Sequence, residues 1–263
     1  MKEESIKRSA RKILSGRWPE AIGAIALGLI AFSIESILAN LLRYIFLLKL
    51  IQLDTFLSLT TIIADLFLFS PLYLGIIRWF WQITGGEDEP ISSVLIYYQN
   101  AEKYFFTIKL RLSFLWRVIV VALISISPAI AIMIVGKIFN YIGGNLSYLY
   151  TPFRTAALVL LVLGAIVALI YLVRFFLVPA ILFSDKNITV TDAFRLSKAL
   201  TYKKRGRAIA FLVLSFLGWA VLSILLLPII YTLPFYLASF LIYSRKSIDD
   251  FVSKSTENTA EKC

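Results

Sequence analysis

Long apolar stretches alternate with short, polar and mostly basic segments along the whole chain of 263 residues. A helix that crosses the hydrocarbon core of a bilayer needs roughly 20 mostly apolar residues. Six stretches reach or approach that length, so the pattern predicts an all-α, polytopic membrane protein with six transmembrane helices. The expected spans are Ala21–Leu42, Phe56–Ile83, Leu112–Ile138, Thr155–Phe183, Ala208–Pro228 and the short Ile229–Tyr243.

Composition agrees with this class. Hydrophobic residues make up 59% of the chain and its mean hydropathy is +0.83, whereas soluble domains are about 45–50% apolar. The N-terminal segment up to Trp18 is polar and basic with no cleavage pattern, so the first span is expected to be retained.

The positive charges are distributed unequally. The chain has 27 Lys and Arg against 16 Asp and Glu, a net charge of +11. On the predicted topology, 22 of these cations lie on the side of both termini and 4 on the other, with Arg174 inside the fourth span. Cytoplasmic loops are enriched in Lys and Arg, so both termini are expected in the cytoplasm and the protein in the cell membrane. The charges flank apolar runs, which favours anionic lipid headgroups over nucleic acid as partners.

A polar stretch with helical periodicity precedes each predicted pair of spans. In each stretch the apolar side chains recur every three or four residues, which predicts an amphipathic helix lying at the cytoplasmic membrane surface. The predicted apolar faces are Ile6, Ala10, Ile13 and Leu14; then Ile91, Val94, Leu95 and Tyr98; and finally Ala193, Leu196 and Leu200, with Arg195 and Lys198 opposite.

Three units of one interfacial helix and one two-span hairpin follow from this pattern. Because each unit has two spans, all three enter from the same side and are parallel repeats. "LSFLW" at Leu112–Trp116 and "LSFLGW" at Leu214–Trp219 echo one another. The expected segments are an interfacial helix (1–18), a hairpin (19–83), an interfacial helix and linker (84–111), a hairpin (112–184), an interfacial helix and basic linker (185–207), a hairpin (208–245) and a polar tail (246–263).

Among the ionisable side chains within the predicted spans, four are candidates for a site: Glu35, Asp65, Arg117 and Arg174. Charge is costly in lipid, so such groups are candidates for function. Glu35 and Asp65 lie on adjacent helices and either form a proton or cation site or make a structural polar contact. Arg117 and Arg174, like Arg111, lie toward the inner ends of their helices and are expected to extend to the headgroups.

Two hypotheses account for the basic residues at the predicted cytoplasmic surface. These residues either anchor the topology or form a specific site for anionic lipid or a partner protein. The candidates are Lys203, Lys204, Arg205 and Arg207 before the fifth span, and Arg8, Arg11 and Lys12 near the N-terminus.

Little in the sequence indicates catalysis. There is no histidine, no phosphate-binding loop, no dinucleotide fingerprint and no nucleophile motif. The acidic segment Gly85–Pro90 either holds a divalent cation or, as we expect, forms a turn before the next helix. We therefore expect no metal, no cofactor and no enzymatic activity, and Cys263 is expected to be an incidental free thiol.

Several stretches resemble the bacterial integral membrane family catalogued as domain of unknown function 975. They are "SARKILSGRWPEAI", "GIIRWFWQITGGEDEPISSVL", "DAFRLSKALTYKKRGRAIAFLVLSFLGWAVLS" and "LPIIYTLPFYLASFLIY". The resemblance covers nearly the whole chain and extends distantly to the membrane domain of some glycerophosphodiester phosphodiesterases. It implies an integral membrane protein and brings no catalytic residues.

Two functions stay open at this point, ahead of a third, a membrane-embedded lipid enzyme. The first is a non-enzymatic scaffold or lipid-interacting factor in envelope homeostasis. The second is a small transporter or channel for a lipid, peptide or ion, with Glu35 and Asp65 near its path. A cavity that reaches these carboxylates favours transport, whereas paired carboxylates in a closed core favour the scaffold. The sequence does not indicate whether the protein forms homo-oligomers.

Overall fold

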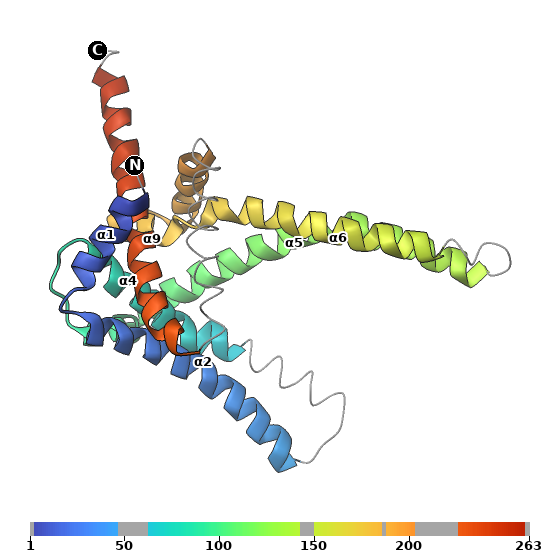
Figure 1. Cartoon of the computed structure of the whole chain (residues 1–263), viewed down its shortest axis with the longest axis horizontal. Coiled ribbons are helices and arrows are strands. Elements are labelled where there is room, and N and C mark those ends of the chain that lie inside the picture. Colours follow the sequence, from blue (N-terminus) through green and yellow to red (C-terminus); the bar gives the residue numbers. More distant parts are fainter. Residues whose placement is uncertain (1–2, 47–62, 143–149, 186–187, 203–225, 261–263) are drawn as a thin grey trace. The chain divides into compact units, whose positions relative to one another are not determined.

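The computed structural model describes residues 3–46, 63–142, 150–185, 188–202 and 226–260. Every regular element in this part of the chain is helical (Figure 1), which confirms the predicted all-α class. Residues 190–202 are also helical. The other elements are α1 (Glu3–Leu14), α2 (Trp18–Phe46), the π-helical turn η1 (Asp65–Phe69), α4 (Ser70–Thr84), the 3₁₀-helix η2 (Ile91–Tyr98), α5 (Ala101–Ile142), α6 (Tyr150–Leu172), the 3₁₀-turn η4 (Val173–Phe175), α7 (Val178–Ser184) and α9 (Leu226–Ala260).

Among the described residues, three helices are long and apolar enough to cross a membrane: Asp65–Thr84, Ala101–Ile142 and Tyr150–Ser184. The bent pair α1–α2 makes a fourth if it is counted as one span. These helices are compatible with a membrane protein. The predicted fifth span lies almost entirely outside the described residues.

The chain forms two compact units, which we describe separately. The first comprises Met1–Leu112 with Leu177–Cys263, and the second comprises Ser113–Phe176. Helix α5 begins at Ala101, within the predicted linker, and contributes to both units.

Helix α4 is the centre of the first unit, where it packs against η2, α9, α2 and α7. A helix that is apolar around its whole circumference is expected to be buried. Trp79 and Phe80 are completely buried and meet edge to face, with ring centroids 5.0 Å apart. Because α4 is enclosed by other helices, it supplies the hydrophobic core of this unit.

Helix α1 has the predicted apolar face, but that face is covered by protein. Ile6, Ala10 and Leu14 are buried where α1 packs against α9 and α4. Gly16, at a positive φ of 89°, ends α1 in a conformation that favours glycine, and α2 leaves at an angle of 95°. The prediction of an amphipathic helix is confirmed, whereas its apolar face contacts helices instead of lipid.

The second predicted amphipathic helix is a 3₁₀-helix, and this geometry divides the predicted apolar face between two sides. Val94 and Tyr97 are buried, while Leu95 and Tyr98 are exposed. A 3₁₀-helix has three residues per turn, so residues i and i+3 share a face and the set expected for an α-helix is divided. η2 folds back along α4 so closely that a Cβ on Gly75 would lie 1.9 Å from the Val94 carbonyl oxygen. Only glycine fits there.

The third amphipathic stretch is helical, as predicted. Thr189 caps it: its hydroxyl accepts a hydrogen bond from the Asp192 amide and donates one to the Asp192 carboxylate. Ala193 and Leu200 are buried, and Arg195 and Lys198 are exposed. Leu196, which was predicted at the centre of the apolar face, is only partly buried, whereas its neighbour Ser197 is completely buried.

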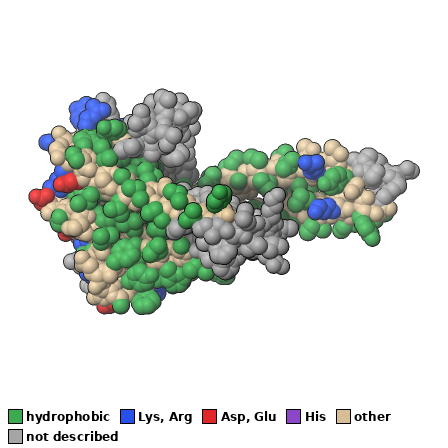
Figure 2. All heavy atoms as spheres, turned by 90° about the horizontal axis from the view of Figure 1, so that it is seen from below, with side chains coloured by type: hydrophobic (Ala, Val, Ile, Leu, Met, Phe, Trp, Pro, Cys, Tyr) green, Lys and Arg blue, Asp and Glu red, His purple; other side chains and the backbone are tan. Residues whose placement is uncertain are grey.

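The second unit is a hairpin of α5 and α6 that packs through small residues. A Cβ on Gly164 would lie 2.2 Å from the Ser125 carbonyl oxygen, and one on Gly136 would lie 2.8 Å from Phe153 Cβ. Small residues let membrane helices approach closely. Most other side chains here are apolar and exposed, and hydrophobic atoms cover much of the visible face of this hairpin (Figure 2). Such a surface fits a lipid environment.

Candidate functional site

Asp65 forms an ion pair with Arg111 in the first unit. The Asp65 Oδ2 and Arg111 Nη2 atoms are 2.8 Å apart, and the two side chains are 32% and 45% exposed. Asp65 begins the π-helical turn before α4, and Arg111 lies on α5. The sequence did not predict this partner, because the pair forms only when η2 turns back and brings the start of α5 to the level of η1.

Two tyrosines hold the π-helical turn in place. The Tyr104 hydroxyl donates a hydrogen bond of 2.7 Å to the Phe67 carbonyl, and the Tyr98 hydroxyl donates one to the Leu68 carbonyl. A π-helix bonds residue i to residue i+5, so carbonyl groups near its ends depart from the α-helical pairing and need other donors. The tyrosines fix the backbone that carries Asp65, and they link η2 and α5 to it.

The opposite end of α4 is capped by Arg245 of α9. Its Nη2 atom donates a 2.9 Å hydrogen bond to the Trp81 carbonyl, and its Cζ atom lies 4.2 Å from the centre of the Trp81 ring. A cation at a helix C-terminus interacts favourably with the helix dipole. Gly85 leaves space for the guanidinium, because a Cβ there would lie 2.6 Å from Nη2.

Acidic residues of the Gly85–Pro90 turn join this capped end. Asp88 pairs with Arg17, and Glu89 accepts a 2.9 Å hydrogen bond from Gln82 and lies 3.9 Å from Arg78. We call Arg17, Arg78, Asp88, Glu89 and Arg245 the charged collar. Gly85 and Gly86 form a turn, as predicted, and the carboxylates of Asp88 and Glu89 both have protein partners. A group of three or more acidic or cysteine side chains that could hold a metal is not found among the described residues.

The other ionisable candidates in the predicted spans are described only in part. Arg117 donates to the Ser113 carbonyl one turn earlier on α5, and Arg174 stacks on Tyr171 with Cζ 4.2 Å from the ring centre. Both belong to the second unit. Glu35 lies on α2, but its side chain is outside the described part of the chain.

The headgroup candidates are described only in part. Arg8, Arg11 and Lys12 lie on the exposed side of α1, away from its buried face. The basic run Lys203–Arg207 falls outside the described residues.

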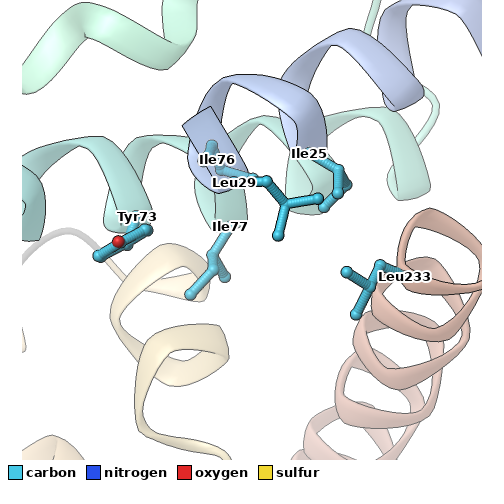
Figure 3. Close-up of a pocket in the computed structure, with 7 residues that line it drawn as sticks. Ile25, Leu29, Tyr73, Ile76, Ile77 and Leu233 are labelled. Atoms are coloured by element: carbon cyan, nitrogen blue, oxygen red, sulfur yellow. The ribbon is translucent and has the colours of Figure 1, made fainter. Parts of the chain in front are cut away.

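An open apolar groove of about 370 Å³ lies between α2, α4 and α9 (Figure 3). This groove was not predicted from the sequence. The one feature of the sequence that relates to it is Gly28, because any larger residue there would place its Cβ 3.1 Å from Ile76 Cδ1 and begin to fill the space. The lining does not include Asp65. It is formed by Ile25, Gly28, Leu29, Tyr73, Ile76, Ile77 and Leu233.

Comparison with known families matches residues 1–248 to one family, described as "Protein of unknown function (DUF975)". No curated protein and no solved structure matches the chain.

Proposed function

The chain belongs to the DUF975 family, whose model covers nearly its whole length, and on that premise we propose that it is a non-enzymatic, lipid-interacting scaffold of the bacterial cell membrane. In this proposal both termini are cytoplasmic, and six spans form three parallel hairpins. Anionic lipid headgroups at the cytoplasmic face are the main partners.

The pairing of Asp65 carries the choice of a scaffold over a transporter. Its carboxylate is neutralised by Arg111 at 2.8 Å, and the apolar groove has no contact with it. A proton or cation path needs a carboxylate that the transported ion can reach. A carboxylate engaged with an arginine instead fixes the position of one helix against another.

Helix α1 supports the choice of lipid headgroups as partners. Its apolar face is fixed against α9, so Arg11 and Lys12 are held on the outer surface. Each basic residue near an anionic membrane contributes about 1 kcal/mol of attraction. A rigid helix that presents several such charges binds headgroups without ordering a flexible segment first.

Two packing features support the proposed topology. Arg17, Arg78 and Arg245 all belong to the predicted cytoplasmic side, and they gather in the charged collar at the C-terminal end of α4. Helices α4, α7 and α9 end the three predicted hairpins, and each packs against the other two. Equivalent helices that meet in this way are expected of parallel repeats.

One observation keeps transport as a second candidate. Asp65 lies in a π-helical turn, an irregularity that is common at functional sites, and it is about one third exposed. Under this alternative, Asp65→Asn would abolish flux of a substrate through proteoliposomes while leaving the purified protein folded.

The lipid-binding proposal is tested by the anionic phospholipid that co-purifies with the protein. Arg11→Gln with Lys12→Gln removes two charges from α1, at a cost of about 2 kcal/mol of binding or roughly thirtyfold in affinity. Arg154→Gln with Lys137→Gln is the matched control, since it removes one Arg and one Lys from exposed positions on the predicted opposite side. Loss of lipid from the α1 variant alone supports the proposal, and equal retention by both variants contradicts it.

A further inference from the structure

We propose that the groove between α2, α4 and α9 holds the acyl chain of a membrane phospholipid. This inference rests on the proposed lipid-interacting function and names the place where the lipid tail binds. In Figure 3, Leu29 of α2 and Leu233 of α9 extend toward the space between their helices, and Ile25 of α2 and Ile77 of α4 also line it.

The chemistry of the lining suits a hydrocarbon. The groove presents isoleucine and leucine side chains from three helices, and Tyr73 has its ring packed beside Phe69. An occupant that carried hydrogen-bonding groups would lose its bonds to water and gain few in return. Only an apolar occupant therefore gains from binding here.

The size of the groove favours a flexible chain over a helix. Its lining covers one turn of α2, Ile25–Leu29, and one turn of α4, Tyr73–Ile77. A docked helix uses anchors spaced over two or more turns. A volume of about 370 Å³ lies instead in the range of small-molecule sites. A short, open groove of this kind accommodates a bent segment of an acyl chain.

The groove also lies at a suitable depth. Trp18 is seven residues before Ile25, so the two lie on one face of α2 about 10 Å apart along its axis. Tryptophan concentrates at the membrane interface, and Trp18 directly follows Arg17 of the charged collar, so it marks the headgroup level on that face of α2. The groove then begins at the level of the lipid tails.

Adjacent surface residues agree with immersion in lipid. Leu27, Ile30 and Ile34 on α2 are exposed and apolar. An exposed apolar strip beside an open groove leaves the groove accessible to lipids that diffuse along the protein. Since Gly28 has no side chain, the groove remains open next to this strip.

A phosphatidylglycerol with a photoreactive diazirine in one acyl chain tests the site. The full chain in detergent receives about one equivalent of this lipid, and the cross-linked residues are mapped by mass spectrometry. We expect labelling of Tyr73–Ile77 to exceed that of the exposed hairpin segment 158–162 by about tenfold, which corresponds to a preference of about 1.4 kcal/mol.

Two tryptophan variants show whether the groove itself binds the lipid. Leu29→Trp fills the groove and should reduce labelling of Tyr73–Ile77 about fivefold, whereas Ile30→Trp, on the exposed strip, should leave it unchanged. Equal labelling of groove and hairpin in the wild-type protein, or an unlabelled groove, would overturn the proposal. If the groove is not labelled but the variant with Arg11→Gln and Lys12→Gln still loses anionic lipid, the acyl-chain site is ruled out. The proposed lipid-interacting function would then still stand.

Discussion

The guanidinium of Arg245 donates a hydrogen bond to the carbonyl of Trp81, 164 positions earlier in the chain, and lies over the ring of the same residue. One side chain thereby caps the central helix α4 and attaches α9 to it. The collar around this contact includes Arg17, which follows α1, and Asp88, which precedes η2. The stability of the first unit should therefore depend strongly on this end of α4.

Replacement of Arg245 should destabilise the first unit. Arg245→Gln removes the favourable charge at the C-terminus of α4 and the cation–π contact, with an expected loss of about 1–2 kcal/mol of unfolding free energy. Lys109→Gln is the control, because it removes one exposed positive charge from α5. Thermal unfolding in detergent measures both. The same melting temperature for the two variants would show that the cap contributes nothing.

Substitution of Gly75 should be far more damaging than substitution of Gly23. A methyl group at Gly75 would meet the Val94 carbonyl at 1.9 Å, and backbone cannot move aside cheaply. We expect Gly75→Ala to cost about 3 kcal/mol or more. At Gly23 the nearest atom is the flexible end of Ile91, 3.3 Å away, so Gly23→Ala should be neutral or stabilising by up to about 1 kcal/mol. The yield of folded protein after purification and its unfolding midpoint distinguish the two, and similar values would contradict the packing of η2 on α4.

Asp65 and Arg111 should show a measurable coupling. Both side chains are partly exposed, so a double-mutant cycle with Asp65→Asn and Arg111→Gln should give a coupling free energy of about 1 kcal/mol. The double variant should remain folded, since it leaves no unpaired charge. Independent effects of the two substitutions would mean that the ion pair does not form.

Tyr97 gives the protein a specific sensitivity to alkali. Burial raises the pKa of Tyr97 to about 12, although nearby Arg78 acts in the opposite direction. The unfolded chain ionises this phenol near pH 10, so the unfolded state loses its proton first and stability falls as the pH rises from about 10 to 12. The contribution of Tyr97 to this loss reaches about 3 kcal/mol, and Tyr97→Phe should remove it.

The control for Tyr97 is Tyr141→Phe, because Tyr141 is 93% exposed. It should unfold with the same pH dependence as the wild-type protein. Unfolding free energies between pH 9 and pH 12 provide the comparison. If Tyr97→Phe remains as sensitive to alkali as Tyr141→Phe, then the buried phenol of η2 is not the cause.

Features that depend on local periodicity were predictable from the sequence. The apolar face of α1 follows from the spacing of Ile6, Ala10 and Leu14, and the cap at Thr189 follows from the acidic residue three positions later. These patterns act within one or two helical turns. They also identify the helical class, because runs of about 20 apolar residues are typical of transmembrane helices.

Features that depend on tertiary packing were not predictable. Leu95 and Tyr98 were assigned to the same α-helical face as Val94, but the close approach of Val94 to Gly75 favours a 3₁₀-helix, in which Leu95 and Tyr98 lie on a different, exposed side. Arg111 was expected to reach the headgroups and instead pairs with Asp65. Each of these outcomes depends on how η2 returns along α4, which hydrophobic periodicity does not encode.

The most direct test of the account is the side of the membrane on which α1 lies. In a chain whose single cysteine is removed by Cys263→Ser, Lys12→Cys and Lys137→Cys each supply one thiol at an exposed position. A membrane-impermeant thiol reagent added to intact cells whose outer surface it can reach should label the Lys137→Cys protein and label the Lys12→Cys protein only after the membrane is permeabilised. Immediate labelling of Lys12→Cys in intact cells, with Lys137→Cys protected, would place the basic face of α1 outside the cell and contradict a cytoplasmic lipid-binding surface.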